Sequence, residues 1–242
     1  MFYQATPFGQ RALPFYQSKG EADTRLFLLQ VIAPKEEPSM FTILLIRHGE
    51  NDYLNKALAG RLPGVHLNAR GKRQAEELTC QISSFPIVAI FSSPLERAQE
   101  TALPLSKALG IPIQADESLT EYGFGEWTGK SMTELESLPG WNDMKHWRSC
   151  TRPPAGEPIV ETQQRIILAL EKIQSLYPEG LVAAITHADN IRAALAFYLG
   201  FSVDLMSRLE ISPCSISVLR LERNQPHILA INRTTLEEIL EK

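Results

Sequence analysis

Short apolar runs that alternate with amphipathic stretches constrain the fold of this chain more than any other feature. The runs 41–46, 87–91 and 181–185 are almost wholly apolar, which is typical of strands buried on both faces of a parallel sheet. Between them, apolar residues recur at steps of three and four, as in Leu95, Ala98, Ala102, Leu105 and Leu109. This alternation predicts an α/β fold, a three-layer α/β/α sandwich with a mostly parallel central sheet.

Turn and capping residues predict where several of these elements begin and end. Asn68 is suited to cap the helix that follows it. Ser93-Pro94-Leu95-Glu96 has the pattern of a capping box with proline at the first helical position, which predicts that a helix starts there. Residues 111–113 are typical of a short strand, and 216–221 with 228–231 of a closing hairpin.

Residues 1–39 differ from the remainder of the chain. Their four basic and four acidic residues cancel, so the whole formal charge of −4 lies in residues 40–242. Met40 stands directly before the first predicted strand. We therefore expect an N-terminal extension, 1–39, that is dispensable, and one domain, 40–242, for which Met40 is an alternative start.

Composition argues against several classes of function. The balance is mildly acidic, and no block of basic residues indicates a nucleic-acid partner. No run of about 18 apolar residues predicts a membrane span. The three cysteines are far apart and form no Cys-x-x-Cys pair, which argues against zinc and against a disulfide framework. We expect reduced thiols in a cytoplasmic protein.

Chemically active residues follow the predicted strands at the points where these end. Arg47 and His48 follow the first strand, Arg97 falls in the first helical turn after the second, and His187 follows the last of the three apolar runs. Glu121 follows the short strand. Taken singly, each residue is equally well explained as part of a solvated turn. Together they favour one site, because the carboxyl ends of parallel strands meet at one edge of a sheet.

These residue types are suited to phosphoryl chemistry. Two arginines with a helix N-terminus form a pocket for a phosphoryl group. A histidine in that pocket can attack phosphorus, and a nearby carboxylic acid can protonate the leaving oxygen. The sequence has no carboxylate or Cys/His cluster at metal-ligand spacing, so we expect Arg47 and Arg97 to neutralise charge in place of a metal. Gly49 would let the backbone approach the ligand closely.

Blocks of residues in a fixed order carry a resemblance to a known family. They are 45–50 (Leu-Ile-Arg-His-Gly-Glu), 67–71 with 74–75, 92–101, 119–121 with 124–129, and 186–187 with 191–192. With these blocks, the chain from Phe41 to about Ile231 resembles the histidine phosphatase (phosphoglycerate mutase-like) superfamily, in its phosphatase branch.

The resemblance implies a role for each candidate residue. His48 would be phosphorylated in a covalent intermediate, while Arg47, Arg97 and His187 hold the phosphoryl oxygens. Glu121 would be the general acid and then the base that activates water, which requires a raised pKa. Members of the family work without a metal or an organic cofactor.

Three positions depart from the family pattern. Many members carry Asn six residues after the nucleophile, where this chain has Leu54 followed by Asn55. We assign substrate binding to Asn55, Gly49 and Ala188. Ala188-Asp189 stands where glycine is common, and we expect the Asp189 side chain to cap the helix or point away from phosphate. His66 replaces a common Asp and receives no role.

The segment after Glu121 distinguishes the branches of this superfamily. Mutases are longer there and keep extra basic residues, whereas 124–129 and 153–157 resemble the phosphatases. We expect a metal-independent phosphomonoesterase of the histidine acid phosphatase type that acts on a small phosphorylated metabolite. A phosphoglycerate mutase and a non-catalytic phospholigand-binding module are the alternatives, and a homodimer is left open.

Residues 130–156 would form a cap that selects the substrate. Trp141, His146, Trp147, Arg148 and Arg152 lie in this segment. They are equally consistent with substrate contact and with simple packing beneath a loop.

Overall fold

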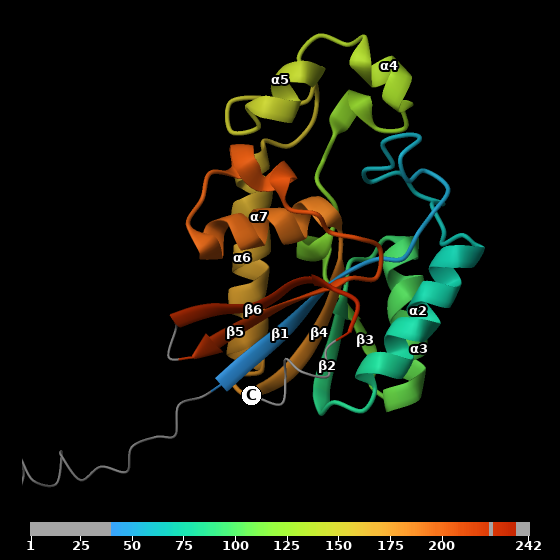
Figure 1. The fold of residues 1–242 in the computed structure, drawn as a ribbon, viewed down its shortest axis with the longest axis vertical. Helices are drawn as coiled ribbons and strands as arrows, with labels where there is room; N and C mark the ends of the chain where they lie inside the picture. The colour runs from blue at the N-terminus through green and yellow to red at the C-terminus, as the bar shows by residue number, and fades with distance from the viewer. Residues whose placement is uncertain (1–39, 223–224, 236–242) are drawn as a thin grey trace, which may run out of the picture. The chain divides into compact units, whose positions relative to one another are not determined.

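A computed structural model describes residues 40–222 and 225–235 of the chain. Its strands are β1 (Met40–Arg47), β2 (Ile87–Ser92), β3 (Ile113–Ala115), β4 (Gly180–Thr186), β5 (Ile216–Glu222) and β6 (Gln225–Arg233). They form one sheet in the order β3-β2-β4-β1-β5-β6 (Figure 1). Within these residues only β5 runs against the others, because β1 and β6 both pair with it in antiparallel register. The predicted α/β fold with a mostly parallel sheet is confirmed.

Helices cover both faces of this sheet. One face packs on α2 (Ala69–Ile82) and α3 (Glu96–Leu109), and the other on α6 (Ile159–Leu176) and α7 (Ala188–Leu199) (Figure 1). Strand β1 serves both layers, because successive side chains of a strand point to opposite faces. Its residues 41, 43 and 45 belong to the core under α6 and α7, and its residues 44 and 46 to the core under α2 and α3.

The remaining elements lie in the connections. They are η1 (Glu117–Leu119), η2 (Gly125–Trp127), α4 (Met132–Glu136), α5 (Trp141–His146) and η3 (Val203–Arg208). Helices α4 and α5 occupy the segment 130–156 that we expect to be a cap. The predicted extension, 1–39, lies outside the described residues. Within the part of the chain that the structure covers, no helix has the length and apolar character needed to cross a bilayer.

Two local predictions were wrong. Helix α3 begins at Glu96 with Leu95 as its N-cap and no side-chain capping bond, so Ser93-Pro94-Leu95-Glu96 is not a capping box. Ser93 Oγ instead lies 2.8 Å from Nε2 of His187. Strand β3 begins at Ile113, not at residue 111. Pro112 has no N–H to donate to a strand ladder, so pairing starts after it.

Asn68 and Gly71 fix the turn that follows β1. The predicted cap is confirmed, since the Asn68 side chain accepts a hydrogen bond from the N–H of Gly71 at 2.9 Å. Gly71 lies directly against the main chain of Glu50, where an added Cβ would collide with the Glu50 carbonyl. A Cβ on Gly49 would lie 2.7 Å from the Gly71 carbonyl oxygen. The start of α2 therefore packs backbone to backbone against the residues that follow the nucleophile candidate.

We predict that Gly71→Ala destabilises the protein by about 1–3 kcal/mol, because the new methyl group has no space and the turn at Glu50 must move. Denaturant unfolding of the variant and the parent measures the difference. Lys72→Ala, at the exposed neighbouring position, is the control and should change the free energy of unfolding by less than about 0.5 kcal/mol. Equal stability of Gly71→Ala and the parent would contradict this account.

Candidate active site

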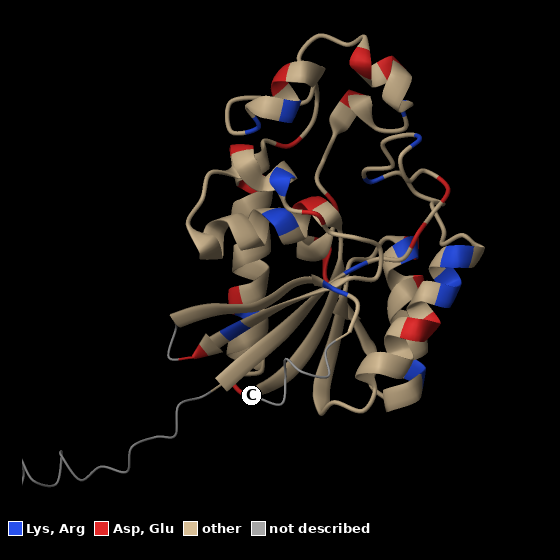
Figure 2. Cartoon of the chain, viewed as in Figure 1, with Lys and Arg blue, Asp and Glu red and all other residues tan. Residues whose placement is uncertain are grey.

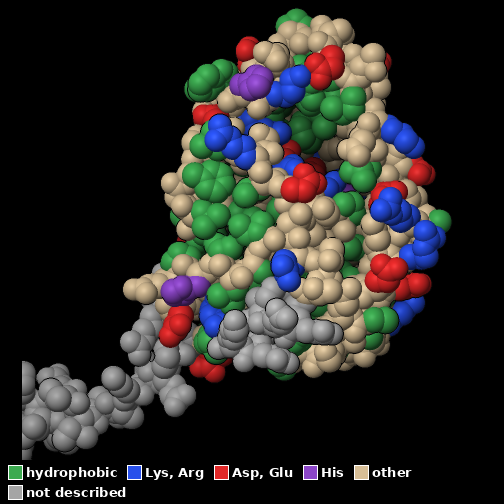
Figure 3. Space-filling model, in the orientation of Figure 1, with side chains coloured by type: hydrophobic (Ala, Val, Ile, Leu, Met, Phe, Trp, Pro, Cys, Tyr) green, Lys and Arg blue, Asp and Glu red, His purple; other side chains and the backbone are tan. Residues whose placement is uncertain are grey.

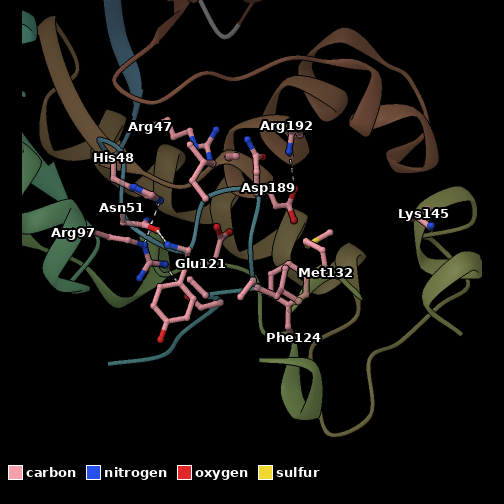
Figure 4. Close-up of a pocket in the computed structure, with 18 of the residues that line it drawn as sticks. Arg47, His48, Asn51, Arg97, Glu121, Phe124, Met132, Lys145, Asp189 and Arg192 are labelled. Carbon is pink, nitrogen blue, oxygen red and sulfur yellow. Dashed lines mark hydrogen bonds and ion pairs between the residues drawn. The ribbon is translucent and has the colours of Figure 1, made fainter. Parts of the chain in front are cut away.

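A cavity of about 390 Å³ opens at the carboxyl ends of the parallel strands. Figure 3 shows it as a hollow in the surface, with charged side chains at its floor, and Figure 4 shows its lining. In Figure 2, basic and acidic residues gather around the same edge of the sheet. The charged residues that line the cavity are Arg47, Arg97, Glu121, Lys145, Arg148, Asp189 and Arg192. His48, Asn55 and Ala188 also line it.

His48 follows β1 and is nearly buried, with 5% of its surface exposed. Its Nδ1 lies 2.7 Å from the carbonyl oxygen of Gly49, which can only accept a hydrogen bond, so Nδ1 carries the proton. Nε2 is then unprotonated, and its lone pair accepts a hydrogen bond from Arg97 Nε at 3.3 Å. Burial, and next the charges of Arg97 and Arg47, hold the His48 pKa well below its usual range. The ring is therefore neutral and nucleophilic at Nε2.

Two guanidinium groups lie beside this ring. Arg97 is 1% exposed, and its Nη2 donates to the Gly60 carbonyl at 2.7 Å and lies 3.2 Å from His187 Nδ1. Arg47 Nη1 donates to the Ile211 carbonyl at 2.5 Å. Among the described residues, Arg97 Nη1 and Arg47 Nε have no hydrogen-bond partner. Unpaired guanidinium donors at a cavity are suited to an anion.

His187 is the N-cap of α7 and is fully buried. Its ring centroid lies 5.1 Å from that of His48, so the structure brings the two histidines together. Burial, and then the charge of Arg97, lower its pKa well below the usual value. The ring is not among the groups that line the cavity, and its Nδ1 lies next to the guanidinium of Arg97. That His187 itself holds a phosphoryl oxygen stays a prediction.

Glu121 lies on the cavity wall between His48 and Asp189 (Figure 4). One carboxylate oxygen accepts from the Tyr122 N–H at 2.9 Å, and the other lies 3.7 Å from His187 Nδ1. Burial, and secondly the negative charge of Asp189, raise the pKa of Glu121 to about 7. A carboxyl group with this pKa can donate a proton at neutral pH, as a general acid must.

Gly49 does not line the cavity, which corrects its assignment as a substrate-binding residue. Its N–H donates to Thr101 Oγ1 at 3.0 Å, and its missing side chain leaves room for Gly71. The close approach that glycine permits here is therefore between two segments of backbone. The approach of a ligand is not needed to explain it.

The Asp189 carboxylate lines the cavity and makes no capping hydrogen bond to α7, so the first of the two expectations for it was wrong. That it points away from phosphate stays a prediction. One oxygen lies 3.2 Å from Arg148 Nη1 and the other 3.2 Å from Arg192 Nη1. These two arginines neutralise a carboxylate that would otherwise repel a bound phosphate.

The segment 130–156 contributes to the cavity through some of its residues only. Trp141 and Arg148 line the cavity, whereas Trp147 is 63% exposed and lies outside the lining. Sequence reasoning missed Met132 and Lys145, which line the cavity from the same segment. It assigned no role to Asn51, Phe124 or Arg192, which also line the cavity. Asn51 follows β1 and Arg192 follows β4, so proximity to a strand end could have pointed to these two.

Among the described residues, no group of three or more His, Cys, Asp or Glu side chains is arranged to hold a metal ion. The positive charge at the cavity comes from arginine and lysine side chains.

The model of the histidine phosphatase superfamily (branch 1) matches residues 43–234. The chain belongs to this superfamily. Phosphoserine phosphatase 1 of Hydrogenobacter thermophilus is 27% identical over 202 residues, which cover 81% of this chain and 93% of that protein. A 2,3-bisphosphoglycerate-dependent phosphoglycerate mutase of Thermoplasma acidophilum is 27% identical over 190 residues, covering 74% of this chain and 86% of that one.

The fold is also that of solved structures. A mycobacterial glucosyl-3-phosphoglycerate phosphatase superposes with a TM-score of 0.72 at 23% identity, covering 80% of this chain and 99% of that one. The family match and the phosphatases among the relatives identify an enzyme that hydrolyses phosphate esters.

We predict that Arg97→Lys weakens the binding of inorganic phosphate by at least about tenfold, because lysine keeps the charge but loses the forked contacts to Gly60, His48 and His187. Calorimetric titration with phosphate measures the change. Arg73→Lys, on the exposed face of α2, is the matched control and should bind phosphate as the parent does. Unchanged phosphate binding by Arg97→Lys would remove Arg97 from the anion site.

Proposed function

We propose that this chain is a metal-independent phosphomonoesterase of the histidine acid phosphatase type that works through a phosphohistidine on His48. One observation carries the proposal. The unprotonated Nε2 of His48 lies 3.3 Å from Arg97 Nε, on a cavity that Glu121 also lines. Nucleophile, anion-binding group and proton donor thus line the same small space.

In the first step, Nε2 of His48 attacks the phosphorus of the bound ester. The P–N bond forms as the bond from phosphorus to the ester oxygen breaks. Glu121 gives its proton to that oxygen, so the alcohol leaves neutral. Arg47 and Arg97 stabilise the charge on the phosphoryl oxygens, with His187 held against Arg97.

In the second step, water replaces the alcohol. The Glu121 carboxylate takes a proton from the water as its oxygen attacks phosphorus. The P–N bond breaks, its electron pair returns to Nε2 of His48, and inorganic phosphate leaves. Glu121 is then protonated again and His48 neutral, which is the state in which the cycle began.

We infer that the substrate is a small phosphorylated metabolite, with Asn55 and Ala188 among the residues that contact it. The cavity of about 390 Å³ has the size of a small-molecule site. Phe124, Met132 and Trp141 give its outer wall apolar surface for the alcohol part. A panel of phosphomonoesters, scored by release of inorganic phosphate, tests this substrate class.

A phosphoglycerate mutase is the second candidate, because a mutase is among the relatives and because Lys145, Arg148 and Arg192 add positive charge beyond the phosphoryl site. Conversion of phosphoglycerate with a bisphosphate primer, without phosphate release, would favour it. A non-catalytic binding module is disfavoured, since His48 and Glu121 are both in place. Binding of phosphate without turnover of any ester would revive it.

We place the enzyme in the cytoplasm, without a nucleic-acid or membrane partner. All three cysteines, Cys80, Cys150 and Cys214, are free thiols, as a reducing compartment favours. Fractionation of cells that express the full chain tests this location. Size-exclusion chromatography with light scattering tests whether the chain forms a homodimer.

We predict that His48→Ala lowers the turnover of every ester by more than about 10³-fold, because no other group can accept the phosphoryl group. The readout is release of inorganic phosphate under saturating substrate. His66→Ala is the control, since His66 lies on the surface beside Glu100. Activity of His48→Ala within tenfold of the parent would exclude His48 as the nucleophile.

The pKa of Glu121 predicts the pH profile. Loss of its proton above about pH 7 removes the acid, so kcat/KM for alkyl phosphates should fall as pH rises through that value. It should not fall through protonation of His48 at moderately acidic pH, because the His48 pKa is lowered. In Glu121→Gln, kcat/KM should no longer fall as pH rises through about 7. Any pH dependence that comes from ionisation of the substrate itself is the same for the parent and the variant. The same fall in Glu121→Gln as in the parent would contradict the assignment.

Metal independence is tested by chelation. We predict that turnover in the presence of excess EDTA equals turnover without it, because arginine charges neutralise the phosphoryl oxygens. Initial rates measured before and after dialysis against EDTA provide the comparison. Strong inhibition that added Mg²⁺ or Zn²⁺ reverses would overturn the metal-free mechanism.

A further inference from the structure

Glu121 lies on irregular chain, and this makes the position of its carboxyl group depend on contacts from elsewhere. Residues 120–124, between η1 and η2, form neither helix nor strand. By contrast, His48 follows directly from the buried strand β1. The sheet therefore fixes the position of the nucleophile His48, whereas the position of the acid Glu121 must be fixed by other contacts.

Two arginines from distant parts of the chain hold the main chain around Glu121. Arg61 Nε donates to the carbonyl of Glu121 itself at 2.6 Å. Arg165 Nη1, from α6, donates to the carbonyls of Ser118 and Thr120 at 2.7 and 2.8 Å. These contacts fix the carbonyl groups on both sides of the Cα atom that carries the carboxyl group.

A single carboxylate, that of Glu157, joins the two arginines. It accepts from Arg61 Nη2 at 2.6 Å, and from Arg165 Nε and Nη2 at 3.0 and 3.1 Å. The same side chain accepts from the N–H of Gly123 at 3.2 Å, and the Glu157 N–H donates to the Gly123 carbonyl at 2.8 Å. Its side chain is only 15% exposed, so these charge-assisted bonds are partly shielded from water.

From this network we propose that Glu157 is the positioning residue for the general acid Glu121. The inference rests on the proposed function. Glu157 touches no reacting atom. Its carboxylate holds Arg61 and Arg165 in place against the loop 120–124. Without its charge, the two guanidinium groups lose their common partner. Misplacing a reacting group by about 1 Å is enough to cost on the order of 100-fold in rate.

The same network reaches the phosphoryl side of the cavity. Arg61 directly follows Gly60, whose carbonyl accepts from Arg97 Nη2 at 2.7 Å. Arg97 also contacts the rings of His48 and His187, so a small shift of Arg61 acts mainly on the acid. Glu157 also directly follows the segment 130–156, where Glu126 N–H donates to the Pro154 carbonyl at 2.9 Å. Glu157, which we propose positions the general acid, is thus next in sequence to the end of the expected cap.

The test compares two esters in Glu157→Gln, a variant of the full chain that keeps the shape of the side chain and removes its charge. We expect kcat for an alkyl phosphate, whose leaving group needs a proton, to fall about 10- to 100-fold. For p-nitrophenyl phosphate, whose leaving group needs little protonation, the loss should stay below about threefold. KM for both esters should change little. In the Glu121→Gln background, Glu157→Gln should cause no further loss on alkyl phosphate.

Glu161→Gln is the matched control, because Glu161 lies four residues further along the chain, in the first turn of α6, and is exposed. It should leave both esters at the parent rate. Equal losses on both esters in Glu157→Gln, or no loss on either, would overturn the inference, since a purely structural role does not select by leaving group. If Glu157→Gln fails to fold, Arg61→Gln, which removes the bond to the Glu121 carbonyl, decides by the same pair of esters.

The two proposals can fail separately. If Glu121→Gln itself shows no dependence on the leaving group, the acid assignment in the proposed function is wrong. If Glu121→Gln shows that dependence and Glu157→Gln does not, the acid assignment stands and only the role of Glu157 falls.

Discussion

The burial of the Arg97 guanidinium beside two imidazoles is the interaction on which the site depends. A cation that is 1% exposed is costly unless hydrogen bonds replace its water, and the Gly60 carbonyl and the ring nitrogens of both histidines supply them. Those rings can accept from Arg97 only while the nitrogens concerned are unprotonated. The same contact that makes burial of the cation tolerable therefore keeps His48 neutral, with its Nε2 unprotonated.

The cationic cavity acts on its carboxyl groups in two different ways. Burial disfavours the charged form of both Glu121 and Asp189. Asp189 has Arg148 and Arg192 as direct partners, and they lower its pKa despite burial. Among the described residues no arginine lies within ion-pair distance of Glu121, and the neighbouring negative charge of Asp189 adds to the effect of burial. One cavity thus holds one carboxyl group ionised and keeps the other able to carry a proton.

The parts of this site that could be predicted from sequence are those that a strand end fixes. His48 and His187 each follow a buried apolar run, and the rule that parallel strands end at one edge was enough to bring them together. Ser93 was misread, because its pattern fits a helix cap equally well until the ring of His187 is placed beside it. Gly49 packs against the start of α2, and Asp189 pairs with Arg148. No local sequence pattern links either residue to its partner, so their roles could not be predicted.

The residues that position the general acid Glu121 were harder to predict from sequence than those that bind the phosphoryl group, because they make contacts between distant segments. Arg61 and Glu157 are 96 residues apart, and each taken alone has the pattern of a surface charge. The groups that bind the phosphoryl group are positioned by the ends of strands and helices. Every phosphate ester presents the same phosphoryl group to them. The acid, in contrast, is positioned by side chains next to the segment 130–156, which also supplies the apolar wall of the cavity. A change in that segment can therefore alter the fit of the alcohol and the placement of its proton donor together, while the attack on phosphorus stays the same.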